Sequence, residues 1–204
     1  KTQMKIETEN QLRELYDLPR GRAKDKVFSI LDKHAINFIS KSPFIVLSTS
    51  NKNGKMDASP RGGNPGFVKV LNSQEIVIPD VKVNNRVDSL INIVETGHIG
   101  MLFLIPGVDE TLRLNGAAFI TSDTKYIEMF LSEKIPVKTC LVIKAEEVFL
   151  YCAKAFMRSK LWHEDSKIER SELPTMGQML SDQSGSNETP ETQEAMVKRY
   201  QKDL

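Results

Sequence analysis

FIVLSTSNKNGKMDASP, residues 44–60, is the stretch of sequence that decides the fold. Its first part, Phe44–Ser50, is apolar and rich in β-branched residues, as half-buried strands are. Asn51–Gly54 ends in Asn-Gly, a dipeptide that favours the tight turn of a hairpin. Lys55–Pro60 then returns as a second strand. The stretch therefore predicts an antiparallel hairpin.

Further along the chain, the strand–turn–strand pattern is repeated. Arg61–Gly66 is rich in glycine and is expected to form a loop. Beyond it, strands are predicted at Phe67–Leu71, Glu75–Pro79, Ile99–Ile105, Thr111–Ile120 and Val137–Leu150. Short strands in succession, joined by turn residues, are typical of an antiparallel meander.

Three other segments have helical periodicity. The first helix is expected over Lys24–Lys41, where His34 lies on an apolar stripe and is expected to be packed or hydrogen-bonded. The second ends at Gly97, and the third covers Asp123–Ser132. The expected inner face of the second helix consists of Val87, Leu90, Ile91 and Val94. Strands with helices packed around them predict an α+β class fold with an antiparallel barrel or sheet.

The composition argues against several classes of protein. Lys and Arg number 28 against 27 Asp and Glu, a net charge of +1, whereas nucleic-acid binders usually carry a basic excess. No apolar run approaches the roughly 20 residues of a membrane span. The charged first twenty residues lack the apolar stretch of a signal peptide. Two separated cysteines, Cys140 and Cys152, are expected as small buried thiols of a cytoplasmic protein.

One domain with extensions at both ends is expected. Residues 1–23 are predicted to be an N-terminal extension, and residues 24–180 the domain itself. Residues 181–204 are predicted to be a flexible polar tail, in which Glu194–Lys202 can form a short helix.

Familiar catalytic and cofactor motifs are absent from the sequence. It contains no dinucleotide-binding glycine loop, no P-loop and no nucleophile elbow. The three histidines have no second ligand at metal spacing, so no metal site is expected. Any cofactor must therefore be held by residues that form no single short motif.

Two polar segments could bind an anion, and each has an ordinary alternative. Asp57–Gly63 combines the donors Ser59 and Arg61 with glycines that let a ligand approach the backbone, but a solvated hairpin loop is equally compatible. Near residue 85 an asparagine can cap a helix and place Arg86 in its first turn. A phosphate would offset the unfavourable helix dipole there, and so would Asp88.

A third segment, Thr111–Ala117, alternates in polarity. Leu112 and Leu114 fall on one face, and Arg113 and Asn115 on the other. Polar groups on a half-apolar face need a ligand or another subunit as partner, unless the face is simply exposed.

The fourth segment is Cys152–Trp162, in which Lys154 and Arg158 lie one helical turn apart. Such charges are usually solvated. Alternatively, the segment brings two cations and an indole to an anionic, aromatic ligand.

Taken together, these segments resemble the pyridoxamine 5′-phosphate oxidase-like family of FMN-binding proteins. The motifs that carry the resemblance are ASPRGG at 58–63, PGFV at 65–68, IPD at 78–80, NNRVDSLINI at 84–93 and LFLIPGVDETLRLNGAA at 102–118. The chain is most similar to a branch that also carries C-x-K-A-x-x-R-S-x-L-W, which stands here at Cys152–Trp162. The resemblance covers about residues 15–180.

The resemblance implies an antiparallel split β-barrel with peripheral helices, working as a homodimer with FMN in each interface cleft. By motif position, the residues expected near the phosphate and ribityl chain of FMN are Arg61, Asn85 and Arg86. Those expected near the ring system, or supporting it, are Ser59, Pro60, Gly62, Phe67, Ile78, Asp80 and Ser89. Arg113 and Asn115 are expected to reach the cleft, either from the same chain or from the partner chain. The residues expected to close it are Lys154, Arg158, Ser159 and Trp162.

One departure from the family bears on the substrate. The vitamin B6 oxidases carry a C-terminal Arg-x-His pair that holds the pyridoxal substrate, whereas His163 here is followed by Glu-Asp-Ser. Oxidation of pyridoxamine 5′-phosphate is therefore doubtful. Two functions remain: a flavin-dependent oxidase or reductase of an unidentified small molecule, or a flavin-binding protein for storage or sensing without turnover. A nucleic-acid-binding module is a third, disfavoured by the neutral charge balance.

Overall fold

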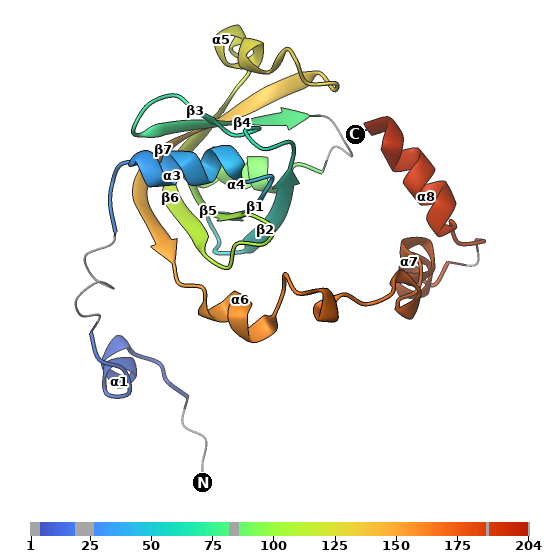
Figure 1. The fold of residues 1–204 in the computed structure, drawn as a ribbon, viewed down its shortest axis with the longest axis horizontal. Coiled ribbons are helices and arrows are strands. Elements are labelled where there is room, and N and C mark those ends of the chain that lie inside the picture. Colours follow the sequence, from blue (N-terminus) through green and yellow to red (C-terminus); the bar gives the residue numbers. More distant parts are fainter. Residues whose placement is uncertain (1–4, 19–26, 82–85, 187, 204) are drawn as a thin grey trace.

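A seven-stranded antiparallel sheet organises the chain, with strand order β2-β1-β5-β6-β7-β4-β3. The computed structural model describes residues 5–18, 27–81, 86–186 and 188–203. The strands are β1 (Phe44–Ser50), β2 (Met56–Gly62), β3 (Lys69–Val70), β4 (Glu75–Val81), β5 (His98–Leu104), β6 (Thr111–Thr121) and β7 (Val137–Tyr151). The sheet curls around one interior, with helices at its periphery (Figure 1). The predicted α+β split barrel is confirmed.

The hairpin predicted from residues 44–60 is present. β1 has the predicted bounds, and the N–H of Asn51 donates to the Lys55 carbonyl across the turn at 2.9 Å. The side-chain oxygen of Asn51 also accepts from the N–H groups of Asn53 and Lys55. Gly54 has a φ of 78°, which glycine adopts at little cost. The turn chemistry therefore sets the register of β1 and β2.

The second strand is longer than predicted. The sequence suggests a loop from Arg61, but Arg61 and Gly62 continue β2 and pair with Ile45 and Phe44 of β1. The loop prediction is wrong here because the β1 ladder offers partners to both residues, and glycine weakens a strand without preventing pairing. The strand predicted over Phe67–Leu71 is correspondingly reduced to the two residues of β3.

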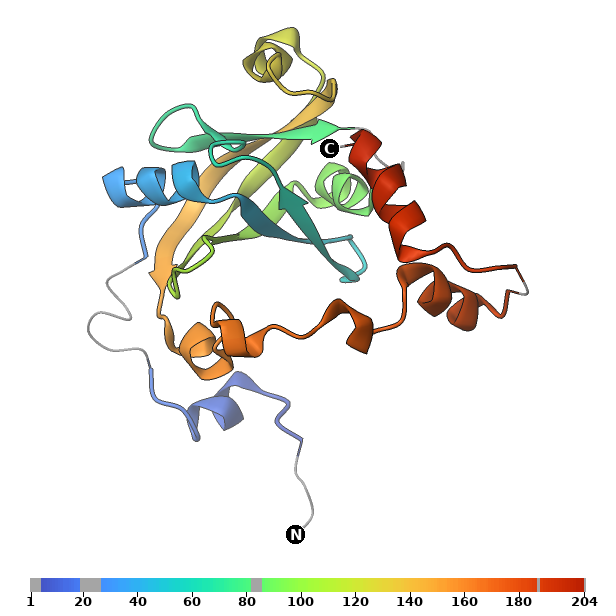
Figure 2. The same ribbon diagram turned by 45° about the vertical axis from the view of Figure 1, so that its right-hand side comes forward.

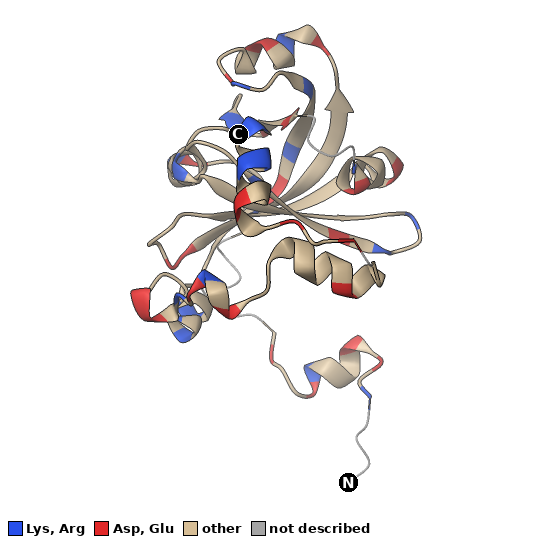
Figure 3. Cartoon of the chain, turned by 90° about the vertical axis from the view of Figure 1, so that its right-hand side faces the viewer, with Lys and Arg blue, Asp and Glu red and all other residues tan. Residues whose placement is uncertain are grey.

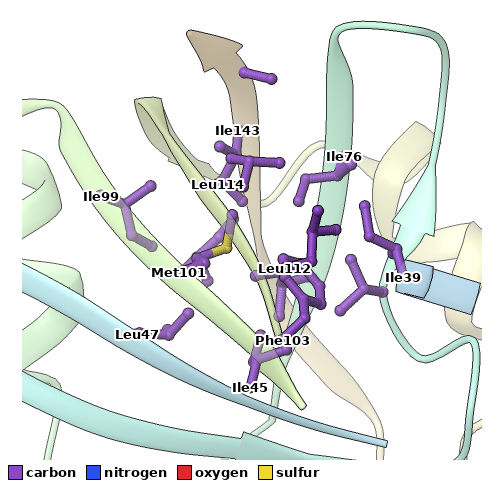
Figure 4. Close-up of a cluster of buried hydrophobic side chains, with 14 of the residues drawn as sticks. Ile39, Ile45, Leu47, Ile76, Ile99, Met101, Phe103, Leu112, Leu114 and Ile143 are labelled. Carbon is purple, nitrogen blue, oxygen red and sulfur yellow. The ribbon is translucent and has the colours of Figure 1, made fainter. Parts of the chain in front are cut away.

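The interior of the barrel is a packed apolar core, closed by α3 (Lys33–Lys41). Figure 4 shows Ile39 of α3 beside core side chains of the sheet: Ile45, Leu47, Ile76, Ile99, Met101, Phe103, Leu112, Leu114 and Ile143. Burial of apolar surface contributes about 25 cal/mol per Å² and dominates the stability of such a core. Because apolar side chains fill the interior, ligand chemistry has to be sought at its rim and on the outer face.

α3 begins later than predicted. Asp32 caps it, and its carboxylate accepts hydrogen bonds from two backbone N–H groups of the first turn. The predicted start at Lys24 is wrong, because Phe28 forms a β-bridge with Val148 instead. Residues 19–26 lie outside the described part of the chain. His34 is exposed, so its predicted packing is wrong as well.

α4 (Asp88–Thr96) turns a different face to the barrel than predicted. Its buried residues are Ser89, Asn92 and Ile93. Of the residues predicted to face inward, Leu90 packs against the core, whereas Val87, Ile91 and Val94 are 40%, 51% and 77% exposed. The apolar periodicity misassigned this helix because its polar side packs against polar residues of β1 and β2. The exposed residues Val87, Ile91 and Val94 are called the outer strip of α4 below.

A second, smaller apolar cluster lies beneath α5 (Thr124–Ile127) and η1 (Glu128–Phe130), which occupy the segment predicted as the third helix. Cys140 is buried in this cluster, as predicted. Cys152 is exposed at the end of β7, which contradicts the prediction of two buried thiols. It follows the last residue of the strand, where the chain leaves the sheet and no core covers it.

Both ends of the chain extend from the barrel (Figures 1 and 2). The helices outside it are α1 (Glu9–Arg13), α6 (Lys154–Ser159), η2 (Glu164–Ser166), η3 (Arg170–Glu172), α7 (Met176–Ser184), α8 (Gln193–Tyr200) and η4 (Gln201–Asp203). α8 lies where the sequence allows a terminal helix, and the last turn of α7 enters the stretch expected to be flexible. In the described ranges, no helix is long and apolar enough to cross a membrane. Charges of both signs are scattered over the helices (Figure 3).

Candidate ligand site

Two clusters of polar residues lie on opposite faces of the sheet. Residues paired between neighbouring antiparallel strands share a face, so the register assigns the faces. Arg61 and Ser59 of β2 pair with Ile45 and Leu47, which point into the core. The neighbouring Pro60 pairs with Val46, and through β5 and β6 this outer row reaches Arg113.

The split cluster comprises Asp57, Ser59, Arg61, Asp80 and Ser89 and lies where the two edges of the sheet approach. Asp57 is its hydrogen-bond acceptor, because its carboxylate receives the hydroxyl protons of Ser59 at 2.8 Å and of Ser89 in α4. Ser89 is 3% exposed, so its only hydroxyl proton is committed to Asp57. The buried side of α4 is thus attached to β2 through polar contacts.

Arg61 links two strands that are not neighbours in the sheet. Its guanidinium lies 3.8 Å from the Asp80 carboxylate of β4, and the two side chains are 26% and 20% exposed. It also donates to the Pro60 carbonyl at 2.9 Å. Burial raises the pKa of the Asp80 carboxyl, and the nearby Arg61 offsets part of this rise. Because 3.8 Å is beyond hydrogen-bond distance, Arg61 retains N–H donors for a ligand.

Arg86 lies ahead of α4 rather than in its first turn. The helix begins at Asp88, and its N-cap is Val87, which makes no side-chain capping hydrogen bond within the described ranges. The guanidinium of Arg86 is exposed and forms an ion pair of 2.6 Å with Asp88, which raises its pKa. Asp88 therefore compensates Arg86, the ligand-free alternative expected from the sequence. Asn85 lies outside the described residues.

A hollow of about 330 Å³ lies beside the split cluster. Its lining combines polar residues with Met56 and Ile91: Asn51, Lys55, Met56, Asp57, Arg86, Asp88, Ile91 and Asn92. Asn92 is held by a buried hydrogen bond of 3.0 Å from its amide to the Thr49 hydroxyl. The wall of the hollow is therefore fixed by the same contacts that orient α4.

The outer-face cluster comprises Arg113, Asn115, Glu147, Phe149 and Tyr151 of β6 and β7. The predicted alternation is present, with Leu112 and Leu114 buried and Arg113 and Asn115 on the other face. The Arg113 guanidinium carbon lies 4.1 Å from the Phe149 ring centroid and 5.3 Å from that of Tyr151. Its Nε is buried and has no hydrogen-bond partner among the residues described.

Asn115 occupies the next row of the outer face. Its amide donates to the Glu147 carboxylate at 2.8 Å. Gly100 lies opposite, where an added Cβ would come within 3.1 Å of the Asn115 side-chain oxygen. A second hollow, of about 260 Å³, is lined by residues of this region that include Ser48, Gly100 and Asn115.

The segment after β7 is folded back to the β5–β6 hairpin. The indole N–H of Trp162 donates to the Val108 carbonyl at 2.9 Å, and the Trp162 ring stacks on Phe156 at 5.5 Å. Lys154 and Arg158 are exposed on α6, one turn apart as predicted, and neither forms an ion pair with another described residue. Ser159 uses its hydroxyl within the helix.

The structure thus distributes the expected site residues over three places. Ser59, Arg61, Asp80 and Ser89 meet in the split cluster, while Arg113 and Asn115 lie on the opposite face. The residues Lys154, Arg158, Ser159 and Trp162 lie on or after α6. Pro60 and Gly62 are exposed on β2, and Phe67 and Ile78 are buried in the core, where they can only support a ligand from beneath.

Sequence reasoning did not single out Asp57, Thr49, Asn92, Phe149 or Tyr151 as site residues. Asp57 could have been found, because it alternates with Ser59 and Arg61 on one strand. The aromatic partners of Arg113 depend on the β6–β7 register, which a bulge shifts between Asn115 and Gly116. No local signal in the sequence specifies that register.

Comparison with known proteins agrees with the split-barrel class that the sheet defines. HupZ from Group A Streptococcus superposes with a TM-score of 0.50 at 15% identity, over 58% of this chain and 92% of that one. A second structure of HupZ gives 0.50 at 14% identity, over 59% and 99%. A Lactobacillus delbrueckii protein described provisionally as a pyridoxamine 5′-phosphate oxidase gives 0.47 at 18%, over 61% and 98%. At these identities the likeness concerns the fold alone.

The family itself is shown by sequence. The sequence model of the family described as pyridoxamine 5′-phosphate oxidase matches residues 31–152, more than half of the chain. The chain therefore belongs to the pyridoxamine 5′-phosphate oxidase family, as its motifs suggested. A search of curated proteins found no match.

Proposed function

We propose that the protein is an FMN-binding flavoprotein that acts as a cytoplasmic homodimer, most simply as an oxidoreductase of a small molecule. The observation that carries this proposal is the half-buried Arg61 at the split of the barrel. It is held near Asp80 at 3.8 Å and keeps N–H donors to offer. An arginine with open donors in a partly desolvated place suits a terminal phosphate.

The donor set of the split cluster fits FMN. Arg61 would bind the phosphate together with Arg86, and the Ser59 hydroxyl lies on the same face of β2 as Arg61. Asp57 and Asp80 hold Ser59 and Arg61 in place rather than contacting the phosphate, because carboxylates and phosphate repel each other. Bound FMN supplies the electron-transfer chemistry, and the chain's residues bind and orient it.

A homodimer would bring the two clusters of different subunits together. The split cluster and the outer-face cluster lie on opposite faces of the sheet, so a ligand on one face of a subunit cannot contact both. In a dimer, the outer face of one copy can cover the split of the other. The exposed apolar side chains of Met56 (69%) and the outer strip of α4 give a second copy apolar surface to bury. Obligate dimers of this kind usually bury at least about 2,000 Å².

Flavin binding without turnover is the second function that a specific observation supports. Each carboxylate of the two clusters is already engaged: Asp57 by two serines, Asp80 by Arg61, and Glu147 by Asn115. A general acid donates a proton to the reacting group, and a general base accepts one from it. These carboxylates already bind protein groups instead. Steady-state oxidation of NAD(P)H with added acceptors separates an oxidoreductase from a storage or sensing protein.

Affinity for FMN against riboflavin tests the phosphate assignment. A charged hydrogen bond contributes about 1.5–3 kcal/mol, so the purified protein should bind FMN about 10- to 150-fold more tightly than riboflavin, measured by quenching of flavin fluorescence. Equal affinities would remove the role assigned to Arg61. Pyridoxine 5′-phosphate should not be oxidised at the roughly 1–10³ s⁻¹ of a dedicated enzyme, because no Arg-x-His pair follows Trp162.

A further inference from the structure

Arg113 is a stacked cation whose charge no carboxylate balances among the residues that the structure describes. The guanidinium stacks on Phe149 and Tyr151, and its buried Nε lacks a hydrogen-bond partner among the described residues. A solvated surface arginine would be mobile, with all its N–H groups in water. Stacking instead restricts the plane of this guanidinium.

Glu147 is the carboxylate that could have neutralised Arg113, and it does not. Arg113 pairs with Phe149 across the β6–β7 ladder, and Asn115 pairs with Glu147 in the next row. Glu147 accepts from the Asn115 amide at 2.8 Å and pairs in the ladder with Asn115 rather than with Arg113. The bulge between Asn115 and Gly116 shifts the register by one residue, which places Phe149 rather than Val148 opposite Arg113.

The row of the outer face that contains Arg113 is otherwise apolar. Through β5 and β1 it continues with Leu102, Val46 and Pro60. These side chains offer contact area without hydrogen bonds, and at the other end Phe149, which is 8% exposed, provides the ring on which the guanidinium stacks. A ligand that fits this row has an apolar, flat body and a single anionic group.

We infer that Arg113, with Phe149 and Tyr151, forms the subsite for the carboxylate of an apolar, planar substrate. This inference rests on the proposed function, because only in the proposed dimer would the subsite face a cleft that holds FMN. It assigns Arg113 to the substrate rather than to the cofactor, whose phosphate is assigned to Arg61. The planar fork of a guanidinium matches a carboxylate with two parallel hydrogen bonds. The exposed cations Lys154 and Arg158, which follow Tyr151 closely in the chain, add to the attraction of an anion.

The test uses three small probes on the full-length protein and calorimetry, a readout that needs no turnover. Benzoate carries the carboxylate on a planar ring, benzamide is its neutral isostere, and inorganic phosphate is an anion without a ring. Benzoate should bind at least tenfold more tightly than benzamide and than phosphate. Equal binding of benzoate and benzamide, no benzoate binding at millimolar concentration, or a preference for phosphate would each overturn the subsite.

Variants then assign the effect to Arg113. Arg113→Met should weaken benzoate at least tenfold, Arg113→Lys by less because the charge stays, and Phe149→Leu should also weaken it because the stacking surface is lost. Lys138→Met, which removes an exposed cation elsewhere on β7, is the matched control and should bind benzoate like the wild type. Thermal unfolding shows whether each variant is folded. If Arg113→Met is unstable, the weaker benzoate binding expected of Arg113→Lys tests the same inference. Retained benzoate binding in Arg113→Met overturns the inference.

FMN titration of the same variants separates this inference from the proposed function. Arg113→Met should bind FMN within about twofold of the wild type, a difference of about 0.4 kcal/mol. Loss of FMN together with benzoate would return Arg113 to the cofactor and overturn the substrate assignment. A wild-type protein that binds benzoate but no FMN would refute the proposed function and leave the subsite standing.

Discussion

On the inner face of the sheet, Arg61 lies 3.8 Å from Asp80, whereas Arg113 on the outer face stacks on two aromatic rings without a carboxylate partner among the described residues. In the split cluster each charged group has a partner within one subunit, so the cluster can be formed before any ligand arrives. In the outer-face cluster, Arg113 has aromatic rings as its partners and no hydrogen bond at its buried Nε among the described residues. The difference separates a cluster whose charged groups are paired within the subunit from one that holds an arginine without such a partner.

The largest effect is expected where a second copy of the chain would cover the outer strip of α4. Val94 is 77% exposed, and Val94→Asp would place a carboxylate in the proposed interface. Burying an uncompensated charge costs several kcal/mol, on the order of 3 or more, so the dimer should dissociate at micromolar concentration. Sedimentation velocity measures this directly.

Leu131→Asp is the matched control for that variant. Leu131 is 76% exposed but follows η1, which lies on the α5 side of the barrel (Figure 1). Its substitution should leave the dimer intact. Dissociation of Leu131→Asp and not of Val94→Asp would move the interface to the other side of the molecule.

The next effect contrasts the two arginines near the split. Arg61→Met should weaken FMN by about 1.5–3 kcal/mol, the size of a charged hydrogen bond. Arg86→Met should weaken it by less, about 0–1 kcal/mol, because Arg86 is exposed and already paired with Asp88 at 2.6 Å. Fluorescence titration of both variants gives the order. The reverse order would assign the phosphate to the start of α4.

A smaller effect concerns the attachment of α4 to β2. Ser89→Ala removes one of the two hydroxyl donors of the Asp57 carboxylate. It should lower the free energy of unfolding by about 1 kcal/mol, the usual net contribution of a hydrogen bond. Urea denaturation checks this value, with Ser40→Ala on the exposed side of α3 as a control that should change little. No loss in Ser89→Ala would mean that the contact does not anchor α4.

Most of the sheet could be predicted from the sequence, because its strands are encoded locally. β1 has the predicted bounds, and β6 and β7 each differ by one residue from the prediction. The face that α4 buries could not be predicted, since Ser89 and Asn92 are buried by partners on β1 and β2 that lie far away in the sequence. For the same reason, the motif positions identified Arg113 as a site residue but not Phe149, which the bulged register brings under it.

The smallest expected effect is on how the stability contributed by Asp80 depends on pH, with and without Arg61. Burial raises the pKa of Asp80 in the folded protein, so the unfolded chain loses this proton at a lower pH than the folded one. As the pH rises from the ordinary pKa of Asp through the raised value, the free energy of unfolding of the wild type therefore falls relative to that of Asp80→Asn. Above the raised pKa, the difference between the two free energies is constant. Urea unfolding between about pH 3 and pH 7 follows the change. In the Arg61→Met background the same difference should be larger, because the attraction that offsets burial is gone. A difference that decreases with pH would show that Arg61 outweighs burial and that the split cluster holds Asp80 in its charged form.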